Sequence, residues 1–169
     1  DVNISHIMDI FCNDTKLNLS KYYLKPGLPF GGPCLLKDTA ALSNSLLSLG
    51  SNTLFDAVIE QNDRHKQKYV EKILRLEIHN IGFYGYEFKV GTGDTRNSPI
   101  LDIAKMLSLK RKIYICDEPH AQTKNSSFDL VNRDNIIAVE TFDELNYICG
   151  VIITQHRISG SKVLLWEDL

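Results

Sequence analysis

The sequence lacks most of the features that mark specialised classes of protein. Its four cysteines are widely spaced with no Cys-x-x-Cys pair, which argues against a disulfide framework and a zinc site. A net charge of −2 at pH 7 and the lack of a long basic run argue against a nucleic-acid partner. No apolar run approaches the ~20 residues that span a bilayer, and the first residues do not resemble a signal peptide. We therefore expect a cytoplasmic protein with reduced thiols, no bound metal and no membrane partner.

Two further absences concern the extent of the chain. No Gly-x-Gly-x-x-Gly follows an expected strand, so the 169 residues carry no dinucleotide-binding fingerprint. The chain also begins at Asp1 rather than at a methionine, next to a stretch whose apolar residues have helical spacing. Its 43% hydrophobic and 24% charged residues are ordinary for a globular protein. We expect a fragment of a longer protein or a truncated gene product.

Helical periodicity dominates the first half of the sequence. Apolar residues follow a helical spacing over residues 4–11 and again over residues 53–74. Between them, Pro33 is typical of a first helical position and Gly50 of a helix end, which predicts a helix over residues 33–49. These helices carry more apolar surface than so small a unit can cover. We therefore expect residues 1–76 to form a helical subdomain through which the chain forms a homodimer.

From residue 78 the pattern changes to strands that alternate with helices. Branched and aromatic residues predict strands at 78–88, 112–117, 149–154 and 162–166, and helices are expected at 99–107 and 143–148. Residues 121–134 are polar and are expected to form a loop. The order of strand, loop, helix and strand favours a parallel sheet with its functional loop at the carboxyl end of a strand. The predicted fold class is α/β, with a Rossmann-like domain over residues 77–169.

One cysteine lies in a setting that suits chemistry. Prolines and glycines over residues 26–33 predict a rigid loop, and Cys34 follows in the expected first turn of a helix. Free backbone N–H groups and the helix dipole favour a thiolate there, and Lys37 and Asp38 share its helix face. The residues alone also allow a plainer interpretation, in which Cys34 is a small apolar residue and its charged neighbours are solvated.

The motif around this cysteine resembles that of a known family. Residues 26–38 read Pro-Gly-x-x-Phe-Gly-Gly-x-Cys-x-x-Lys-Asp, which looks like the active-site cysteine motif P-G-x-x-F-G-G-S-C-x-P-K-D of the UDP-glucose/GDP-mannose dehydrogenase family. Pro33 and Leu36 replace the usual serine and proline. Residues 16–27 look more like the GDP-mannose branch, although Lys25 stands where that branch usually has arginine and Leu28 where it usually has phenylalanine.

A second signature follows the first expected strand. Residues 88–99 read Phe-Lys-x-Gly-Thr-Gly-Asp-Thr-Arg-Asn-Ser-Pro, which resembles the F-K-x-G-T-x-D-x-R-x-S-P of the nucleotide-sugar-binding domain in the same family. Taken alone, this stretch could be a solvated polar loop with glycines for its turn. Two signatures in the order of the family strengthen the resemblance.

The resemblance implies an oxidoreductase in which NAD accepts two hydrides from the primary alcohol of a nucleotide sugar. Cys34 would be the nucleophile that carries the sugar as a thiohemiacetal and then a thioester, and Asp38 would orient water or balance charge. Lys37 and Arg96 would contact NAD. The implied substrate-binding residues are Tyr22, Tyr23, Lys25, Leu28, Gly31 and Lys89.

The resemblance leaves several alternatives open. The family's NAD domain would precede Asp1, so this chain is expected to be inactive alone and NAD to be bound mainly elsewhere. The chain could instead be a catalytically incomplete module that binds nucleotide sugar and forms oligomers, or an unrelated thiol enzyme. Residues 16–25 favour GDP over UDP sugars, but the base and the sugar stay undetermined at this stage.

Overall fold

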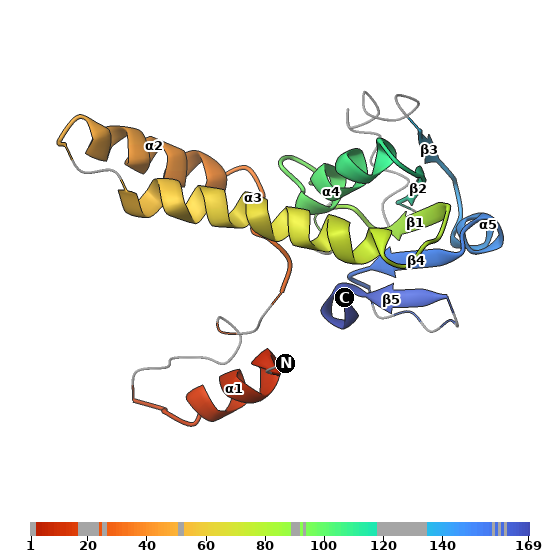
Figure 1. The fold of residues 1–169 in the computed structure, drawn as a ribbon, viewed down its shortest axis with the longest axis horizontal. Coiled ribbons are helices and arrows are strands. Elements are labelled where there is room, and N and C mark those ends of the chain that lie inside the picture. The colour runs from red at the N-terminus through yellow and green to blue at the C-terminus, as the bar shows by residue number, and fades with distance from the viewer. Residues whose placement is uncertain are drawn as a thin grey trace.

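A helical part and a parallel sheet follow one another along the chain (Figure 1). The computed structural model describes residues 3–16, 24, 27–50, 53–88, 92, 94–117, 135–156, 158, 160 and 162–169. The helices are α1 (Ile4–Phe11), α2 (Leu35–Leu47), α3 (Thr53–Leu74), α4 (Pro99–Ser108) and α5 (Phe142–Ile148). The strands are β1 (Asn80–Tyr84), β2 (Lys112–Cys116), β3 (Ile136–Ala138), β4 (Val151–Thr154) and β5 (Val163–Leu165), followed by a short 3-10 helix over Trp166–Asp168.

The helical part consists of α1 and a hairpin of α2 and α3. Helix α1 lies apart from the hairpin in Figure 1, and α2 runs beside the first half of α3. Gly50 takes a φ of +74° after α2, in the left-handed region that glycine adopts at helix ends. A hydrogen bond from Ser43 to Asp56 links the two helices. The predicted helices over residues 4–11 and 53–74 are confirmed.

The start of α2 differs from the sequence-based prediction. The helix begins at Leu35, so Pro33 is not its first residue and Cys34 is the N-cap rather than part of the first turn. Before the helix, Gly32 has a left-handed φ of +84° and its amide is hydrogen-bonded to Asn97 O. The Cys34 carbonyl accepts the first helical hydrogen bond, from Asp38 N at 2.8 Å.

The sheet is parallel throughout, with the strand order β3-β2-β1-β4-β5. Ile81 of β1 pairs with Ile113 of β2 on one side and with Val151 of β4 on the other. This sheet confirms the predicted α/β class. Strand β3 was not predicted. The loop predicted over residues 121–134 lies outside the described residues.

Alternate strand residues face two hydrophobic layers, as the period of a strand requires. One face packs against α3 and α4 and includes Ile81, Phe83, Ile113, Ile115, Ile153, Ile100, Ile103, Leu107, Tyr69 and Ile73. The other face packs against α5 and includes Cys116, Ile152, Leu145 and Cys149. Because the second half of α3 is part of the sheet's core, one helix fixes the α2–α3 hairpin to the sheet. The domain boundary between residues 76 and 77 stays a prediction.

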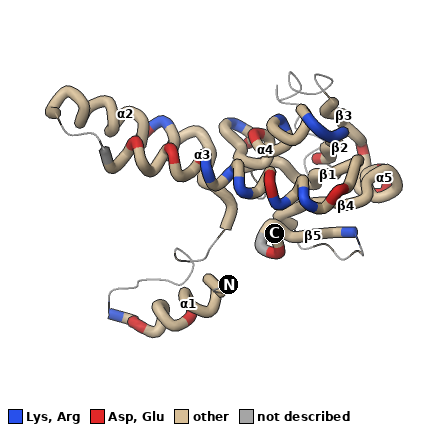
Figure 2. Tube along the Cα trace, viewed as in Figure 1, with Lys and Arg blue, Asp and Glu red and all other residues tan. Residues whose placement is uncertain are grey.

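Charged residues of both signs occur along α3, as Figure 2 shows. This helix has 22 residues, the most of any helix in the described parts of the chain. Across those parts, no helix combines the length with the apolar character that crossing a membrane would need.

Candidate functional site

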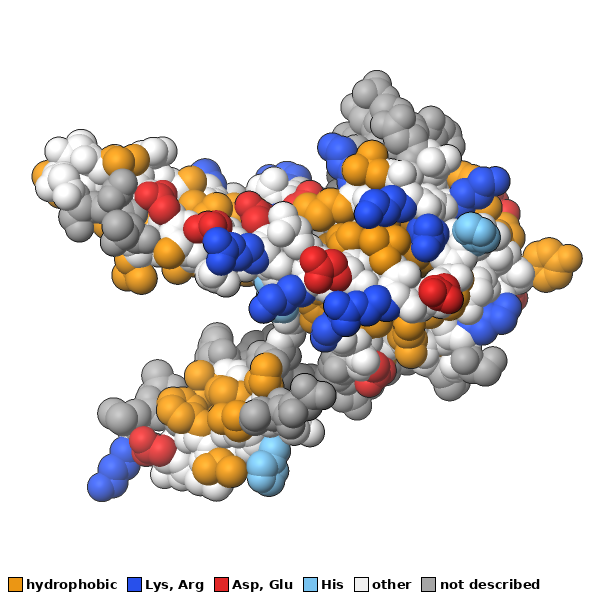
Figure 3. Space-filling view, in the orientation of Figure 1, with side chains coloured by type: hydrophobic (Ala, Val, Ile, Leu, Met, Phe, Trp, Pro, Cys, Tyr) orange, Lys and Arg blue, Asp and Glu red, His pale blue; other side chains and the backbone are white. Residues whose placement is uncertain are grey.

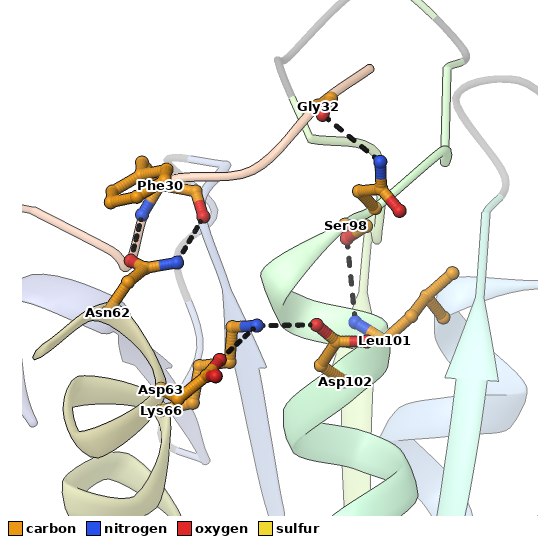
Figure 4. Close-up of polar contacts among 9 residues, drawn as sticks. Phe30, Gly32, Asn62, Asp63, Lys66, Ser98, Leu101 and Asp102 are labelled. Atoms are coloured by element: carbon orange, nitrogen blue, oxygen red, sulfur yellow. Dashed lines mark hydrogen bonds and ion pairs between the residues drawn. The ribbon is translucent and has the colours of Figure 1, made fainter. Parts of the chain in front are cut away.

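Two loops that are distant in sequence are joined by hydrogen bonds beside the sheet. We call residues 27–34 the cysteine loop and residues 88–98 the β1–α4 loop, of which positions 89–91 and 93 lie outside the described residues. The Gly32 amide donates to Asn97 O at 3.1 Å, and Asn97 Nδ2 donates to Gly32 O at 3.3 Å. Figure 4 draws the second of these bonds above the start of α4. The two family-like motifs are therefore joined in the fold and form the candidate site.

The glycine pair makes this contact possible. A Cβ on Gly31 would lie 2.3 Å from Asn97 O and 2.6 Å from Pro99 Cδ, which no side chain could tolerate. Gly32 has a φ of +84°, and a Cβ there would lie 2.8 Å from the ring of Phe88. The prediction that these glycines allow close backbone approach is confirmed. The role of Gly31 toward a substrate stays a prediction.

Helix α3 holds the cysteine loop from the other side. The buried Asn62 side chain accepts a hydrogen bond from Phe30 N at 2.8 Å and donates one from Nδ2 to Phe30 O at 2.9 Å (Figure 4). A single amide thus satisfies both backbone groups of one loop residue. Sequence reasoning missed Asn62, because it lies in a stretch of α3 that reads as solvated polar surface.

Lys66, one turn further along α3, connects this helix to α4. Its ammonium lies 2.8 Å from Asp102 Oδ2 and 3.1 Å from Asp63 Oδ1, and its side chain is only 8% exposed (Figure 4). Burial alone would lower the pKa of Lys66, but the hydrogen bonds to the two carboxylates raise it overall. The ion pair therefore fixes α4, whose first turn follows the β1–α4 loop directly.

Cys34 is exposed at the N-terminal end of α2, whereas Cys12, Cys116 and Cys149 are buried. Lys37 and Asp38 lie in the first turn after it and form an exposed ion pair with an Nζ–Oδ1 distance of 3.5 Å. The structure thus places Lys37 and Asp38 in the first turn of α2, directly after the N-cap residue Cys34. A thiol in this position faces backbone N–H groups that lack helical partners.

Arg96 lies in the β1–α4 loop, which the Gly32–Asn97 hydrogen bonds join to the cysteine loop. Its guanidinium contacts both carboxylate oxygens of Asp94, with Nη2–Oδ2 at 2.6 Å and Nε–Oδ1 at 3.0 Å. This contact lowers the pKa of Asp94 to about 2. The same hydrogen bonds raise the pKa of Arg96. Its side chain is still 70% exposed.

The predicted substrate-binding residues are placed only in part. Tyr22, Tyr23, Lys25 and Lys89 lie outside the described residues. Leu28 is partly buried and packs against the core of the sheet, so its side chain contributes to folding. None of these positions is tested by the geometry, and their roles stay predictions.

A surface cavity of about 480 Å³ lies at the amino ends of the strands, opposite the two joined loops. It is lined by residues at the amino ends of the strands and after α4, namely His79, Asn80, Leu109, Lys110, Arg111, Lys112 and Asn135. The two joined loops are at the carboxyl ends, where ligands of parallel α/β sheets bind. This cavity is therefore separate from the candidate site.

Comparison with known proteins confirms the family resemblance. Residues 1–64 match the sequence profile of the UDP-glucose/GDP-mannose dehydrogenase family, central domain. The chain is 39% identical over 102 residues to the GDP-mannose 6-dehydrogenase of Pseudomonas aeruginosa, which covers 60% of this chain and 23% of that protein. It is 32% identical over 161 residues to the GDP-mannose 6-dehydrogenase of Pseudomonas savastanoi pv. phaseolicola, which covers 82% of this chain and 37% of that protein.

The fold agrees with the same relationship. A crystal structure of a ternary complex of GDP-mannose dehydrogenase from Pseudomonas aeruginosa matches this structure with a TM-score of 0.74 and 28% sequence identity. The match covers 95% of this chain and 41% of that chain. The chain thus spans less than half the length of the relatives that it matches.

Proposed function

We propose, because this chain is related to the UDP-glucose/GDP-mannose dehydrogenase family, that it is part of an NAD-dependent nucleotide-sugar 6-dehydrogenase. The substrate would be GDP-mannose or a similar nucleotide sugar, oxidised at its primary alcohol to the uronate. One observation carries the proposal: the exposed Cys34 thiol lies at a helix start, in a loop that hydrogen bonds between Gly32 and Asn97 join to the loop of Arg96. A cation and free backbone N–H groups are the surroundings that make a thiol nucleophilic.

The chemistry assigned to this chain centres on Cys34. Its thiolate adds to C6 of the sugar aldehyde, and the carbonyl oxygen takes a proton to give a thiohemiacetal. Backbone N–H groups at the start of α2 stabilise the developing oxyanion. Loss of a hydride from C6 and of the hydroxyl proton to solvent leaves a thioester on Cys34. Water held by Asp38 then attacks the thioester carbon, which releases the uronate and restores the thiol.

Two exposed cations suit a nucleotide cofactor. NAD, when bound, would accept the two hydrides that leave C6. Lys37 and Arg96 would hold its anionic groups, since both side chains are largely exposed and belong to the two motifs that the Gly32–Asn97 hydrogen bonds join. A cation can exchange an exposed carboxylate partner for a phosphate at little cost.

The nucleotide sugar would lie between the cysteine loop and the β1–α4 loop. Tyr22, Tyr23, Lys25, Leu28, Gly31 and Lys89 are its proposed contacts. Guanine is the proposed base, because residues 16–25 resemble the GDP-mannose branch and the relatives described above are GDP-mannose 6-dehydrogenases. A cytoplasmic location also belongs to this proposal, since all four thiols are unpaired.

The thiohemiacetal step can be tested without NAD. We would add the C6 aldehyde of GDP-mannose, labelled with ¹³C at C6, to the chain and record ¹³C spectra. We expect a new resonance from an sp³ carbon bonded to sulfur, and its loss in Cys34→Ala. In Cys149→Ala, which removes a buried thiol, the resonance should persist. Nucleotide binding without this resonance would reject the catalytic role and favour the non-catalytic binding module.

A homodimer is proposed from the exposed apolar side chains of the helical part. Ile4, Ile7, Ile10 and Phe11 of α1 are all exposed, as are Leu42, Leu47, Leu54 and Val58 of the hairpin. Figure 3 shows hydrophobic side chains gathered on α1. Such faces are uncommon on monomers. Light scattering should give a dimer that Val58→Asp weakens and Gln61→Asp does not; a monomer at high concentration would reject it.

A further inference from the structure

Glu87 follows β1 and is completely buried, with 0% of its surface exposed. A carboxylate in this environment needs partners that compensate for its lost hydration. Its Oε2 accepts a hydrogen bond from Thr92 N at 3.1 Å. Its Oε1 lies 3.7 Å from His156 Nε2. Glu87 therefore contacts both the β1–α4 loop and the segment that follows β4.

The segments after β1 and β4 are joined by further hydrogen bonds. Gln155 Nε2 donates to Glu87 O at 2.9 Å, and Thr154 Oγ1 donates to Tyr84 O at 2.8 Å. The His156 amide in turn donates to Thr154 Oγ1 at 2.9 Å. These bonds hold the end of β4 against the backbone that leads into the β1–α4 loop.

This junction lies where the strand order of the sheet reverses. Strands β2 and β3 extend the sheet on one side of β1, whereas β4 and β5 extend it on the other. The carboxyl ends of β1 and β4 thus flank the switch point at which parallel sheets bind ligands. Glu87 and His156 are nevertheless 0% and 16% exposed at their side chains, so they act through the loop and not by ligand contact.

We propose that Glu87 and His156 are positioning residues that hold the described part of the β1–α4 loop in the shape that presents Arg96. The carboxylate fixes the Thr92 amide, and Phe88 N closes the same loop with a bond to Asp94 O at 2.9 Å. Arg96 lies two residues after Asp94, and the Asp94 carboxylate orients its guanidinium. The link between this arrangement and nucleotide binding rests on the proposed function above. The positioning of the loop by Glu87 does not depend on that proposal.

Gly85 offers an independent way to disturb the pair. It has a φ of +69°, and a Cβ there would lie 2.1 Å from His156 Nε2. The imidazole can occupy its place beside Glu87 only because residue 85 has no side chain. Gly50 is a matched control, since its φ is +74° but nothing lies within 4 Å of its Cβ position. Comparison of the two alanine variants separates backbone strain from displacement of His156.

The test is amide hydrogen exchange at Thr92 in the chain without ligand. Glu87→Ala removes the acceptor and should speed exchange at Thr92 about tenfold, which corresponds to about 1.4 kcal/mol, close to the lower end of what a hydrogen bond to a charged group contributes. Gly85→Ala should also speed it, and Gly50→Ala should not. Glu87→Gln keeps an acceptor oxygen and should stay within about threefold of the parent chain. Far-UV circular dichroism would establish that each variant remains folded.

Binding of GDP, measured by calorimetry on the same variants, separates this inference from the proposed function. We expect Glu87→Ala to weaken GDP binding about tenfold, in parallel with its effect on exchange. Failure of the parent chain to bind GDP would reject the proposed function, while altered exchange would still support the loop-holding role. Unchanged Thr92 exchange in folded Glu87→Ala and Gly85→Ala would overturn the inference.

Discussion

Gly32 and Asn97, which are 65 residues apart, exchange two hydrogen bonds of 3.1 and 3.3 Å. Gly32 comes two residues before Cys34, and Asn97 comes directly after Arg96. This pair therefore sets where the thiol and the guanidinium lie relative to one another. Loss of these two hydrogen bonds would separate the two motifs, although each motif could still fold locally.

Gly31→Ala should destabilise the chain by about 1–3 kcal/mol, the usual cost of forcing extra atoms into a packed site. The added methyl group would meet Asn97 O and Pro99 Cδ, both of which belong to or adjoin the start of α4. The measurement is the free energy of unfolding from urea titration. Gly27→Ala is the control, because nothing lies within 4 Å of its Cβ position. Equal effects of the two substitutions would contradict the docking of these loops.

The regular elements were predicted well where one pattern persisted over many residues. Helix α3 has the predicted bounds of residues 53 and 74, because apolar residues at both ends kept the helical period. Strand β3 was missed, since it has only three residues and two of them are exposed. Short edge strands of this kind carry little alternation, and their pairing partner decides whether they form.

The candidate site was predicted in parts and not as a whole. The sequence indicated Cys34 and Arg96 through separate motifs, but nothing local reveals that Gly32 and Asn97 join the two motifs. Asn62 and Lys66 were missed, because periodicity cannot distinguish a polar face toward water from one toward another loop. Glu87 was missed for a similar reason: the chain around it reads as a strand, and its burial depends on the segment after β4.

Asp102→Ala should lower the free energy of unfolding by about 1–2 kcal/mol, because it removes one of the two carboxylates that compensate the buried ammonium of Lys66. Lys66→Met removes the charge together with its need for partners, so its effect should be smaller. Chemical unfolding at pH 7 would compare them. A larger loss in Lys66→Met than in Asp102→Ala would contradict this interpretation.

The same ion pair predicts a dependence of stability on alkaline pH. The pKa of Lys66 is raised in the folded chain above its ordinary value of 10.5. Its contribution to stability is therefore complete below pH 10.5 and is lost as the pH rises through the folded value. As the pH rises through this range, the unfolding free energy of the parent chain should fall relative to that of Lys66→Met. A constant difference would show that Lys66 has an unchanged pKa.

Arg96→Gln should return the pKa of Asp94 from about 2 toward its ordinary value of 3.8, because hydrogen bonds from Arg96 cause most of the shift. A lowered carboxyl pKa stabilises the folded chain above pH 3.8, and this contribution is lost as the pH falls toward 2. The titration of the Asp94 carboxyl carbon can be followed by NMR. Arg64→Gln is the control, since Arg64 pairs with Glu60 instead. The same pKa of Asp94 in Arg96→Gln and in Arg64→Gln would exclude the contact between Arg96 and Asp94.

Limiting iodoacetamide at neutral pH should label Cys34 before the other three thiols. Cys34 is exposed, whereas Cys12, Cys116 and Cys149 are buried, and burial raises the pKa of Cys149 to about 12. Peptide mass mapping gives the order of labelling, and the preference should disappear in denaturing urea. Labelling of a buried thiol first in the folded chain would contradict the assignment.

The labelling rate also tests whether Arg96 influences Cys34. A nearby guanidinium stabilises the thiolate, which is the form that reacts with iodoacetamide. Arg96→Gln should therefore slow the alkylation of Cys34 several-fold, on the order of the loss of one partly screened charge contact. Arg75→Gln, a substitution just after the end of α3, should leave the rate unchanged. Because Cys34 is exposed in each variant, a slower rate reports the charge of its surroundings. Equal alkylation rates in the two variants would show that Arg96 does not influence the thiol. The candidate site would then consist of Cys34, Lys37 and Asp38 alone.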